Sequence, residues 1–404
     1  MAMPCSFTNE IKPATKEHTK MSHLQEEDWV AFRDELLREA KRRGFVAAGI
    51  ASVEPYTQER EWAIQALETG RMEGMDWYTR HHIEMASDFR AQFPWVQSVL
   101  SLAWPYRPSA TPGLPMIPLA SVAGRPRGRI SGYACTTNGT DGNRRTLDYH
   151  IHLSRACAAL RDWIRQSYPD AKALHQVDHK HSFDRACAVR AGLGFTGKHA
   201  QLLTASAGSY VFLAELLLSL PLPPTSPTKR NCGTCSACLP ACPTGAILAP
   251  GVIDGPRCIA YLTIEHRGAI PEHLRSLMGT WIFGCDVCQE ACPINKRLAP
   301  TPLECGDATT ARGPVPYPDL VECLELTQQE FEKRFAYTPV WRTGREGLAR
   351  NAAIALGNAG DTEAIPALET ALQSDPDLVV RESAAWSLAT LKSGRVRSSH
   401  DPFS

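Results

Sequence analysis

Two closely spaced groups of cysteines in the middle of the chain constrain its fold more than any other feature. The first group reads Cys232-Gly-Thr-Cys235-Ser-Ala-Cys238-Leu-Pro-Ala-Cys242-Pro243. The second reads Cys285-Asp-Val-Cys288-Gln-Glu-Ala-Cys292-Pro293, and Cys258 stands alone between the two groups. The first group has the C-x2-C-x2-C-x3-C-P spacing that holds iron–sulfur clusters in bacterial two-cluster ferredoxins. The spacing therefore predicts an iron–sulfur module.

Eight thiolates are the number that two 4Fe-4S clusters need. In two-cluster ferredoxins the fourth cysteine of the run binds the other cluster. Crossing the fourth ligands in this way predicts a first set, Cys232, Cys235, Cys238 and Cys292, and a second set, Cys242, Cys258, Cys285 and Cys288. A zinc site is the alternative, but four-cysteine zinc sites typically use two C-x2-C pairs rather than a triplet.

The other cysteines have no ligand spacing, and we expect buried apolar side chains or bystanders. They are Cys5, Cys135, Cys157, Cys187, Cys305 and Cys323. Thiolate-bound clusters imply a reducing compartment, in which structural disulfides are not expected. Residues 1–20 lack the apolar core of a signal peptide, and the most apolar stretch, residues 210–222, is too short to span a bilayer. We therefore expect a cytoplasmic protein with no membrane segment.

The chain of 404 residues is long enough for several domains, and its formal net charge is zero. After a polar tail, residues 1–24, which we expect to be disordered, hydrophobic periodicity predicts alternating helices and strands up to residue 220. Helices are expected at 29–43, 62–79, 147–167 and 183–191, and strands at 44–50, 96–103 and 210–218. This alternation is typical of an α/β domain, here residues 25–220.

Two further domains are expected behind the proline-rich linker that begins at Pro221. The cluster module covers residues 229–298. In residues 317–396, two similar Ala/Leu-rich segments begin at Arg350 and Arg381, 31 residues apart, which is typical of HEAT-like helical repeats. An ordinary helical hairpin is the alternative for this last region.

Residues 177–199 contain the densest group of polar side chains in the first domain. Asp178 follows an expected strand and is a candidate general acid, although the pattern alone favours a helix cap or a surface ion pair. Gly192, Gly194 and Gly197 predict a close backbone approach, to a bulky ligand for example. No acidic residue follows at the distance that a dinucleotide site requires, so we do not predict a nicotinamide site. His179 and His181 provide too few ligands for a metal site. Asp148 is either a helix cap or part of a pocket edge.

Taken together, these segments resemble the epoxyqueuosine reductase family. The similarity extends from about Gly44 to Leu391, and the motifs that carry it are Met75-Asp-Trp-Tyr-Thr-Arg80-His, Asp148-Tyr-His, Val177-Asp178, Ala191-Gly-Leu-Gly-Phe-Thr-Gly-Lys-His, the whole cysteine set and Arg350-Asn-Ala-Ala-Ile-Ala-Leu-Gly-Asn. The resemblance implies an α/β (α+β) cobalamin-binding catalytic domain, a ferredoxin-like module with two 4Fe-4S clusters and a C-terminal α-helical HEAT-like region.

The resemblance also implies an oxidoreductase that reduces epoxyqueuosine to queuosine at the wobble position of tRNA. It places the proton donor at Asp178 and cobalamin contacts at Arg80, Asp178, Ile259, Asp286 and Val287. Arg350 and neighbouring basic residues would hold the anticodon stem-loop. A flavodoxin or ferredoxin would supply low-potential electrons, and we expect a monomer.

Two departures from the family pattern lie near the expected pocket. His179 and His181 replace a small hydroxyl residue and a proline, and residues 135–145 form an insertion. Two alternatives therefore stay open: a corrinoid-dependent reductase of another small epoxide or halogenated substrate, and a non-catalytic two-cluster electron-transfer protein.

Overall fold

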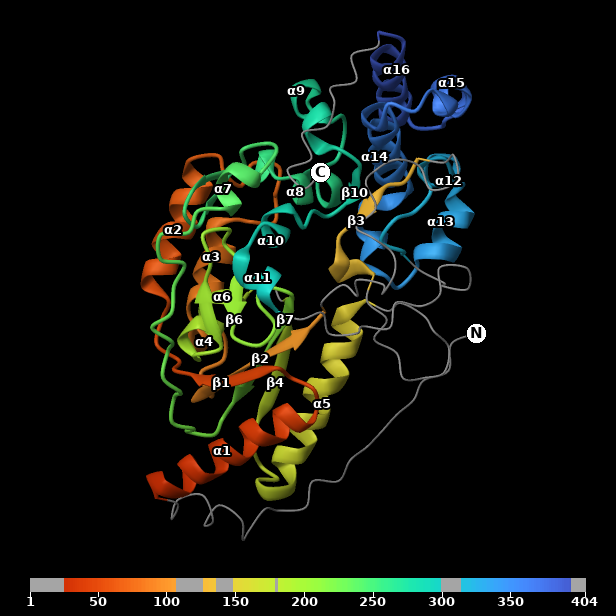
Figure 1. Ribbon diagram of the computed structural model, residues 1–404. Helices are drawn as coiled ribbons and strands as arrows, with labels where there is room; N and C mark the ends of the chain where they lie inside the picture. The colour runs from red at the N-terminus through yellow and green to blue at the C-terminus, as the bar shows by residue number, and fades with distance from the viewer. Residues whose placement is uncertain (1–24, 107–125, 136–147, 179–180, 299–313, 394–404) are drawn as a thin grey trace, which may run out of the picture.

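The computed structural model describes residues 25–106, 126–135, 148–178, 181–298 and 314–393 (Figure 1). The expected disordered tail, most of the insertion, His179, Cys5 and Cys305 lie outside these described residues. Within them, no helix combines the length and the apolar composition that a membrane crossing requires.

A four-stranded antiparallel sheet forms the centre of the first domain. Its strands are β1 (Ala47–Ala51), β2 (Ser98–Pro105), β7 (Val211–Leu218) and β4 (Ala173–Val177), in the spatial order β1-β2-β7-β4. The two central strands are buried over almost their whole length, because helices cover both faces of the sheet. Helices α1 (Glu26–Arg42) and α5 (Tyr149–Ser167) pack on one face, and α6 (Asp184–Arg190) packs on the other (Figure 1).

Six of the expected elements differ from the observed ones by only a few residues at each end, but the helix expected at 62–79 is wrong in its extent. Helix α2 (Thr57–Glu68) ends at Glu68, and α3 (Arg80–Ser87) begins only after Thr79, whose side chain accepts a hydrogen bond from the His82 amide. Between them, Gly70 and Gly74 have φ angles of +73° and +77°, a left-handed conformation that ends helices. A short helix, α4 (Phe89–Gln92), and a hairpin of β5 (Gly194–Thr196) and β6 (Leu202–Thr204) complete this domain.

The cysteine-rich segment folds into short elements joined by turns. They are α7 (Cys238–Ala241), β8 (Ile247–Ala249), β9 (Val252–Ile253), α8 (Ile259–Ile264), α9 (Glu272–Arg275), β10 (Trp281–Phe283), α10 (Val287–Glu290) and α11 (Pro293–Arg297). Strand β10 pairs in parallel with β3 (Arg129–Ile130) of the preceding region. Short 3-10 helices lie at Gly132–Ala134, Gly255–Arg257, Ser276–Met278, Pro339–Thr343 and Thr362–Ala364.

The C-terminal region is entirely helical in its described part. It contains α12 (Leu320–Glu325), α13 (Gln328–Phe335), α14 (Gly344–Ala359), α15 (Ile365–Ser374) and α16 (Leu378–Lys392). The two similar sequence segments are α14 and α16, which pack against each other (Figure 1). A Cβ atom on Gly357 would lie 2.6 Å from the Ser387 hydroxyl oxygen, so glycine permits this close helix contact.

Helix α14 joins the helical region to the cluster module through Arg350. This side chain is 2% exposed and donates hydrogen bonds to the carbonyl oxygens of Leu262, His266 and Gly268 at 2.8–2.9 Å. Arg345 is also buried and forms an ion pair with Asp375. The expectation that Arg350 holds RNA is therefore wrong: its guanidinium bonds the protein's own backbone and does not reach the surface.

Candidate functional site

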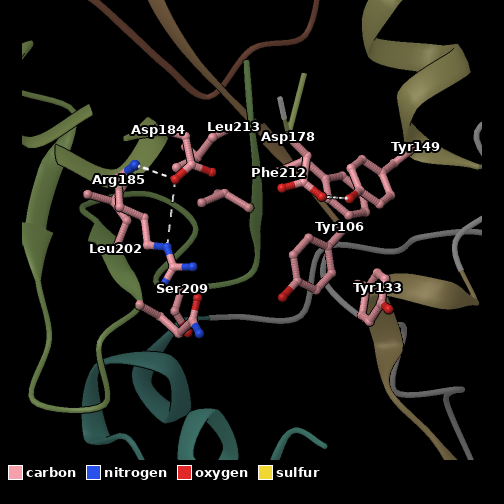
Figure 2. Close-up of a pocket in the computed structure, with 12 residues that line it drawn as sticks. Tyr106, Tyr133, Tyr149, Asp178, Asp184, Arg185, Leu202, Ser209, Phe212 and Leu213 are labelled. Carbon is pink, nitrogen blue, oxygen red and sulfur yellow. Dashed lines mark hydrogen bonds and ion pairs between the residues drawn. The ribbon is translucent and has the colours of Figure 1, made fainter. Parts of the chain in front are cut away.

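A cavity of about 310 Å³ opens between the sheet and the cluster module. Aromatic, apolar and charged side chains line it: Tyr106, Tyr133, Tyr149, Asp178, Asp184, Arg185, Gln201, Leu202, Ser209, Val211, Phe212 and Leu213 (Figure 2). Strand β7 supplies three neighbouring lining residues, because its end reaches the rim of the sheet. This cavity contains the candidate proton donor Asp178.

Asp178 follows β4 directly and has a φ angle of +45°. Aspartate adopts this left-handed conformation more readily than most residues, and such angles cluster at functional sites. The Tyr149 hydroxyl donates a hydrogen bond to Asp178 Oδ2 (Figure 2). His150 Nε2 lies 3.9 Å from the same oxygen. The carboxyl group is therefore held toward α5, although its side chain is 61% exposed.

The start of α5 is held in turn by the C-terminal region. Asp148 caps the helix through the His150 amide, and its carboxylate accepts from Arg342 Nη2 at 2.8 Å and contacts His150 Nδ1 at 2.7 Å. Burial alone would raise the pKa of Asp148, but the hydrogen bonds from His150 and the charge of Arg342 outweigh burial and lower it. The Asp148 amide also donates to the carbonyl oxygen of Tyr337 at 2.7 Å. Of the two alternatives for Asp148, the structure shows the helix cap; its neighbour Tyr149, and not Asp148 itself, lines the cavity.

Two further carboxyl groups lie behind Asp178. Asp184 lines the cavity at the start of α6, and Glu215 points from β7 into the same side of the sheet. Glu215 is 0% exposed, and burial, followed by the charge of Asp184, raises its pKa well above the usual range. Burial likewise raises the pKa of Asp184. Burial therefore favours the protonated, neutral form of Glu215.

The cluster module is hydrogen-bonded to residues that line the cavity. Gln289 Oε1 accepts hydrogen bonds from the hydroxyls of Tyr106 and Ser209, at 3.3 and 2.8 Å, and both of these residues line the cavity. Asp286 accepts from the Ser131 hydroxyl and the Gly132 amide at 2.7 and 2.8 Å. Since Asp286 and Gln289 directly follow Cys285 and Cys288, the second cysteine set borders the cavity.

Within each of the two predicted sets, several cysteine thiols lie near one another, and the assignment of each thiol to a cluster stays a prediction. Burial and the neighbouring thiolates of Cys232, Cys292 and Cys235 raise the pKa of Cys238. Burial, followed by the thiolate of Cys258, raises the pKa of Cys288 above its usual range, and Cys242 contributes in the same direction.

The number and spacing of the thiols suit clusters better than zinc. Eight cysteines, with a C-x2-C-x2-C-x3-C-P run among them, match two 4Fe-4S clusters, whereas four-cysteine zinc sites typically use two C-x2-C pairs.

The residues expected to contact cobalamin lie around the cavity rather than in its lining, Asp178 excepted. Ile259 and Val287 share one apolar cluster with Met75, Cys258 and Cys285. Arg80 is exposed at the start of α3 and forms an ion pair with Glu68 at 2.6 Å. The aromatic walls of the cavity and this apolar cluster beside the second thiol set are compatible with a flat macrocycle, and we treat these contacts as expectations.

Gly192 and Gly194 do not have the role that the sequence predicted for them. A Cβ atom on Gly192 or Gly194 would lie 2.4 or 2.2 Å from the carbonyl oxygens of Ser226 and Leu203, so these glycines approach the chain's own backbone rather than a ligand. Cys135, Cys157, Cys187 and Cys323 are buried, as expected for apolar side chains.

Sequence reasoning gave no role to three of the residues that line the cavity, Tyr106, Tyr133 and Tyr149, and it grouped Arg342 with the basic residues expected to hold RNA rather than with Asp148. The one available signal was the position of Tyr149 inside the motif Asp148-Tyr-His. The pairing of Tyr149 with Asp178 joins residues 29 positions apart, and the contact of Arg342 with α5 spans an even longer separation.

Comparison with known proteins agrees with this arrangement. The family model described as "Epoxyqueuosine reductase QueG, DUF1730" matches residues 87–179, which include Asp178. The model "4Fe-4S double cluster binding domain" matches residues 231–295, and "HEAT repeats" matches residues 340–398.

Relatives and solved structures extend the similarity over most of the chain. The epoxyqueuosine reductase of Escherichia coli (strain K12) is 36% identical over 349 residues, 86% of each chain, and that of Aliivibrio fischeri is 37% identical over 341 residues, 84% of this chain and 86% of the relative. A crystal structure of epoxyqueuosine reductase with an epoxyqueuosine-modified tRNA-Tyr stem loop superposes with a TM-score of 0.78 at 30% identity, covering 90% of this chain and 91% of the other. The chain therefore belongs to the epoxyqueuosine reductase family.

Proposed function

We propose that this protein reduces epoxyqueuosine to queuosine at the wobble position of tRNA. The observation that carries the proposal is the cavity, in which a tyrosine-held carboxyl group, Asp178, lies together with Tyr106, whose hydroxyl donates to Gln289 next to Cys288 of the second cysteine set. Family membership supplies the reaction, and the tRNA stem loop bound by a relative of similar structure supplies the substrate class.

The cofactors of the proposal are two 4Fe-4S clusters and cobalamin, which this family uses. The first and second cysteine sets would hold one cluster each. Arg80, Ile259, Asp286 and Val287 would contact cobalamin together with Asp178. Since the Asp286 carboxylate is 4% exposed and already accepts protein hydrogen bonds, we expect its contact through the backbone. Residues 25–220, 229–298 and 317–396 would form the catalytic, cluster and helical-repeat domains.

The chemistry requires electrons and protons in equal number. Reduction of the epoxide to an alkene with release of water consumes two electrons and two protons. Bound cobalamin supplies a strongly reducing cobalt centre for this step. Asp178 would donate one of the two protons to the epoxide oxygen, and the second proton would come from solvent, so that the oxygen leaves as water rather than as a charged group. Tyr149 and His150 orient the Asp178 carboxyl group, and the aromatic walls exclude water.

The tRNA is proposed to bind where the helical-repeat region meets α5. Tyr337 and Trp341 are 66% and 46% exposed, and the Tyr337 carbonyl is bonded to Asp148 at the edge of the site. Exposed aromatic rings stack on unpaired bases, and the wobble base is part of a single-stranded loop that can splay out. Tyr337, Trp341 and Arg342 are therefore proposed to bind the tRNA, the role that was expected of Arg350 from the sequence.

The remaining parts of the proposal concern the setting of the reaction. We expect a monomer that works in the cytoplasm, where tRNA is modified, with an external low-potential donor such as a flavodoxin or ferredoxin. A small-substrate corrinoid reductase would not need an aromatic surface beside the cavity.

Complementation tests the proposal in cells. The protein would be expressed in an Escherichia coli strain that lacks its own epoxyqueuosine reductase, and tRNA nucleosides would be measured by mass spectrometry. We expect queuosine to replace epoxyqueuosine in strains that express the wild-type protein in cobalamin-supplemented medium. Persistence of epoxyqueuosine, with the soluble protein present and its clusters loaded, would reject the proposed substrate.

A further inference from the structure

One edge of the cluster module brings a cysteine thiol to the protein surface. Within the first set, Cys235 is exposed and Cys232 is partly exposed, whereas Cys238 and Cys292 are buried. Gly233, Thr234 and Ser236, which flank Cys235, are exposed as well. A cluster held by the first set would therefore have one edge at the solvent.

The second set lies toward the interior. None of its four cysteines is exposed. Gln289, next to Cys288, is hydrogen-bonded to the cavity residues Tyr106 and Ser209. Helix α7, which begins at Cys238, contacts α10, which contains Cys288. The two sets therefore form a continuous path from Cys235 at the surface to the cavity.

Positive charge surrounds the exposed end of this path. Lys229 and Arg230 are exposed and immediately precede the first cysteine group, and Lys198 Nζ donates to the carbonyl oxygen of Gly233 at 3.0 Å. None of these three side chains forms an ion pair with a carboxylate in the described part of the chain. The whole sequence from Leu216 to Ile253 contains no aspartate or glutamate. We call Lys198, Lys229, Arg230 and Cys235 the docking patch.

We propose that the docking patch is where an acidic one-electron carrier protein binds and passes electrons to the first cysteine set. The proposal deepens the proposed function and rests on it, because a chain that reduces no substrate needs no electron supply. Electron transfer weakens steeply with distance, so a carrier must approach the one cluster edge that reaches the surface. Unpaired cations around that edge attract an acidic partner and speed its association, even in a chain with zero net charge.

The electron balance sets how the patch is used. Each epoxide reduced to an alkene and water takes up two electrons and two protons. A flavodoxin hydroquinone that is oxidised to its semiquinone releases one electron, so two such visits supply one turnover. Because the carrier must leave after each one-electron transfer, the complex has to dissociate quickly. A small charged patch suits such a transient complex better than a large apolar interface.

The test compares two charge-reversed variants of the cluster-loaded protein. Lys229→Glu/Arg230→Glu reverses the docking patch. Arg165→Glu/Lys172→Glu is the matched control, which reverses an exposed arginine in the last turn of α5 and an exposed lysine just before β4. The probe is a bacterial flavodoxin hydroquinone, whose oxidation by each protein is followed by stopped-flow absorbance at low and high salt. Turnover with titanium(III) citrate, a small reductant that needs no docking, is measured in parallel.

We expect the patch variant to oxidise the hydroquinone with a second-order rate constant at least about tenfold lower than wild type at low salt, with a smaller difference at high salt. The control variant keeps the wild-type rate, and all three proteins turn over equally with titanium(III) citrate. Equal hydroquinone oxidation by the patch and control variants overturns the inference. Failure of every protein to reduce the tRNA with titanium(III) citrate would instead reject the proposed function, while the oxidation rates still report on docking.

Discussion

At the scale of single residues, Asp178 combines an unusual backbone angle with a position that three segments define. Strand β4 delivers it to the cavity rim, Tyr149 bonds its carboxyl group, and Asp148 and Arg342 fix the helix that carries Tyr149. A general acid must be placed within hydrogen-bond reach of the atom that it protonates. The tyrosine bond restrains the carboxyl group and leaves its other oxygen available to a substrate.

The first prediction removes the acidic proton and keeps the shape of the side chain. Asp178→Asn is expected to lower single-turnover reduction of the tRNA by about 10²- to 10⁴-fold, the usual contribution of a general acid. Iron content and the cluster absorbance stay at wild-type values, because Asp178 is not a cluster ligand. Asp170→Asn, at an exposed position, is the control. Wild-type turnover by the Asp178 variant would remove this residue from its proposed role.

The second prediction concerns the pH dependence of stability. The folded-state pKa of Glu215 is raised well above the ordinary value of 4.5, chiefly by burial. As the pH rises above the ordinary value of 4.5, the unfolded chain loses the Glu215 proton while the folded protein keeps it. The free energy of unfolding therefore falls as the pH rises. The contribution is complete below the unfolded pKa and is lost as the pH rises through the folded pKa.

Glu215→Gln replaces the ionisable carboxyl group with a neutral amide, so this contribution to the pH dependence of stability is lost. Its melting temperature relative to wild type is therefore expected to rise progressively between about pH 5 and pH 8. Glu325→Gln, at an exposed position of α12, should show a constant difference. Differential scanning fluorimetry across this range measures both, and parallel curves for Glu215→Gln and wild type would contradict a buried neutral acid.

At the scale of elements, the junction between α5 and the turn before α14 links the helical-repeat region to the reaction site. Arg342 pairs with Asp148, and its guanidinium lies 5.7 Å from the centre of the Tyr149 ring. The neighbouring Tyr337 has a φ angle of +65°, and its carbonyl accepts from the Asp148 amide. This junction places an exposed aromatic ring at the edge of the cavity.

The third prediction tests that ring as an RNA contact. Tyr337→Ala is expected to weaken binding of an anticodon stem-loop by about 1–3 kcal/mol, the usual value of one base–aromatic stack. Fluorescence anisotropy with a labelled stem-loop measures the dissociation constant. Trp62→Ala, which removes a 59% exposed ring on α2, should leave it unchanged. Equal losses in the two variants would place the RNA elsewhere.

The fourth prediction separates a structural arginine from an RNA-binding one. Arg350→Met leaves three backbone carbonyls of the cluster module without this donor, at a cost of roughly 1–3 kcal/mol for each group that stays buried. We expect a melting temperature several degrees lower, with unchanged stem-loop affinity in the folded protein. Arg381→Met, at the corresponding position of the second repeat, should destabilise less. A loss of affinity without a loss of stability would restore the RNA-binding role.

At the scale of the whole molecule, the three regions meet at one cavity. The sheet supplies Asp178 and the β7 residues, the cluster module supplies the wall around Gln289, and the helical region supplies Arg342. The exposed end of the cluster module and the aromatic junction lie on different parts of the chain, so an electron carrier and a tRNA need not compete for one surface.

The sequence predicts well those features that depend on neighbouring residues. The iron–sulfur module follows from cysteine spacing, since ligand geometry is local, and β7 follows from a continuous apolar run. The sequence could not show that Arg350 is buried or that Tyr149 holds Asp178, because both depend on packing between distant segments. The error at 62–79 arose from Gly70 and Gly74, whose left-handed angles end a helix despite a helical pattern.

The most direct measurement of the central claim uses purified, cluster-loaded protein with cobalamin, titanium(III) citrate and epoxyqueuosine-containing tRNA under anaerobic conditions. Nucleosides from the digested tRNA are quantified by mass spectrometry, with Asp178→Asn and a cobalamin-free sample in parallel. We predict that queuosine forms only in the complete wild-type reaction. Unchanged epoxyqueuosine in that reaction, with both clusters and cobalamin bound, would contradict the proposed function.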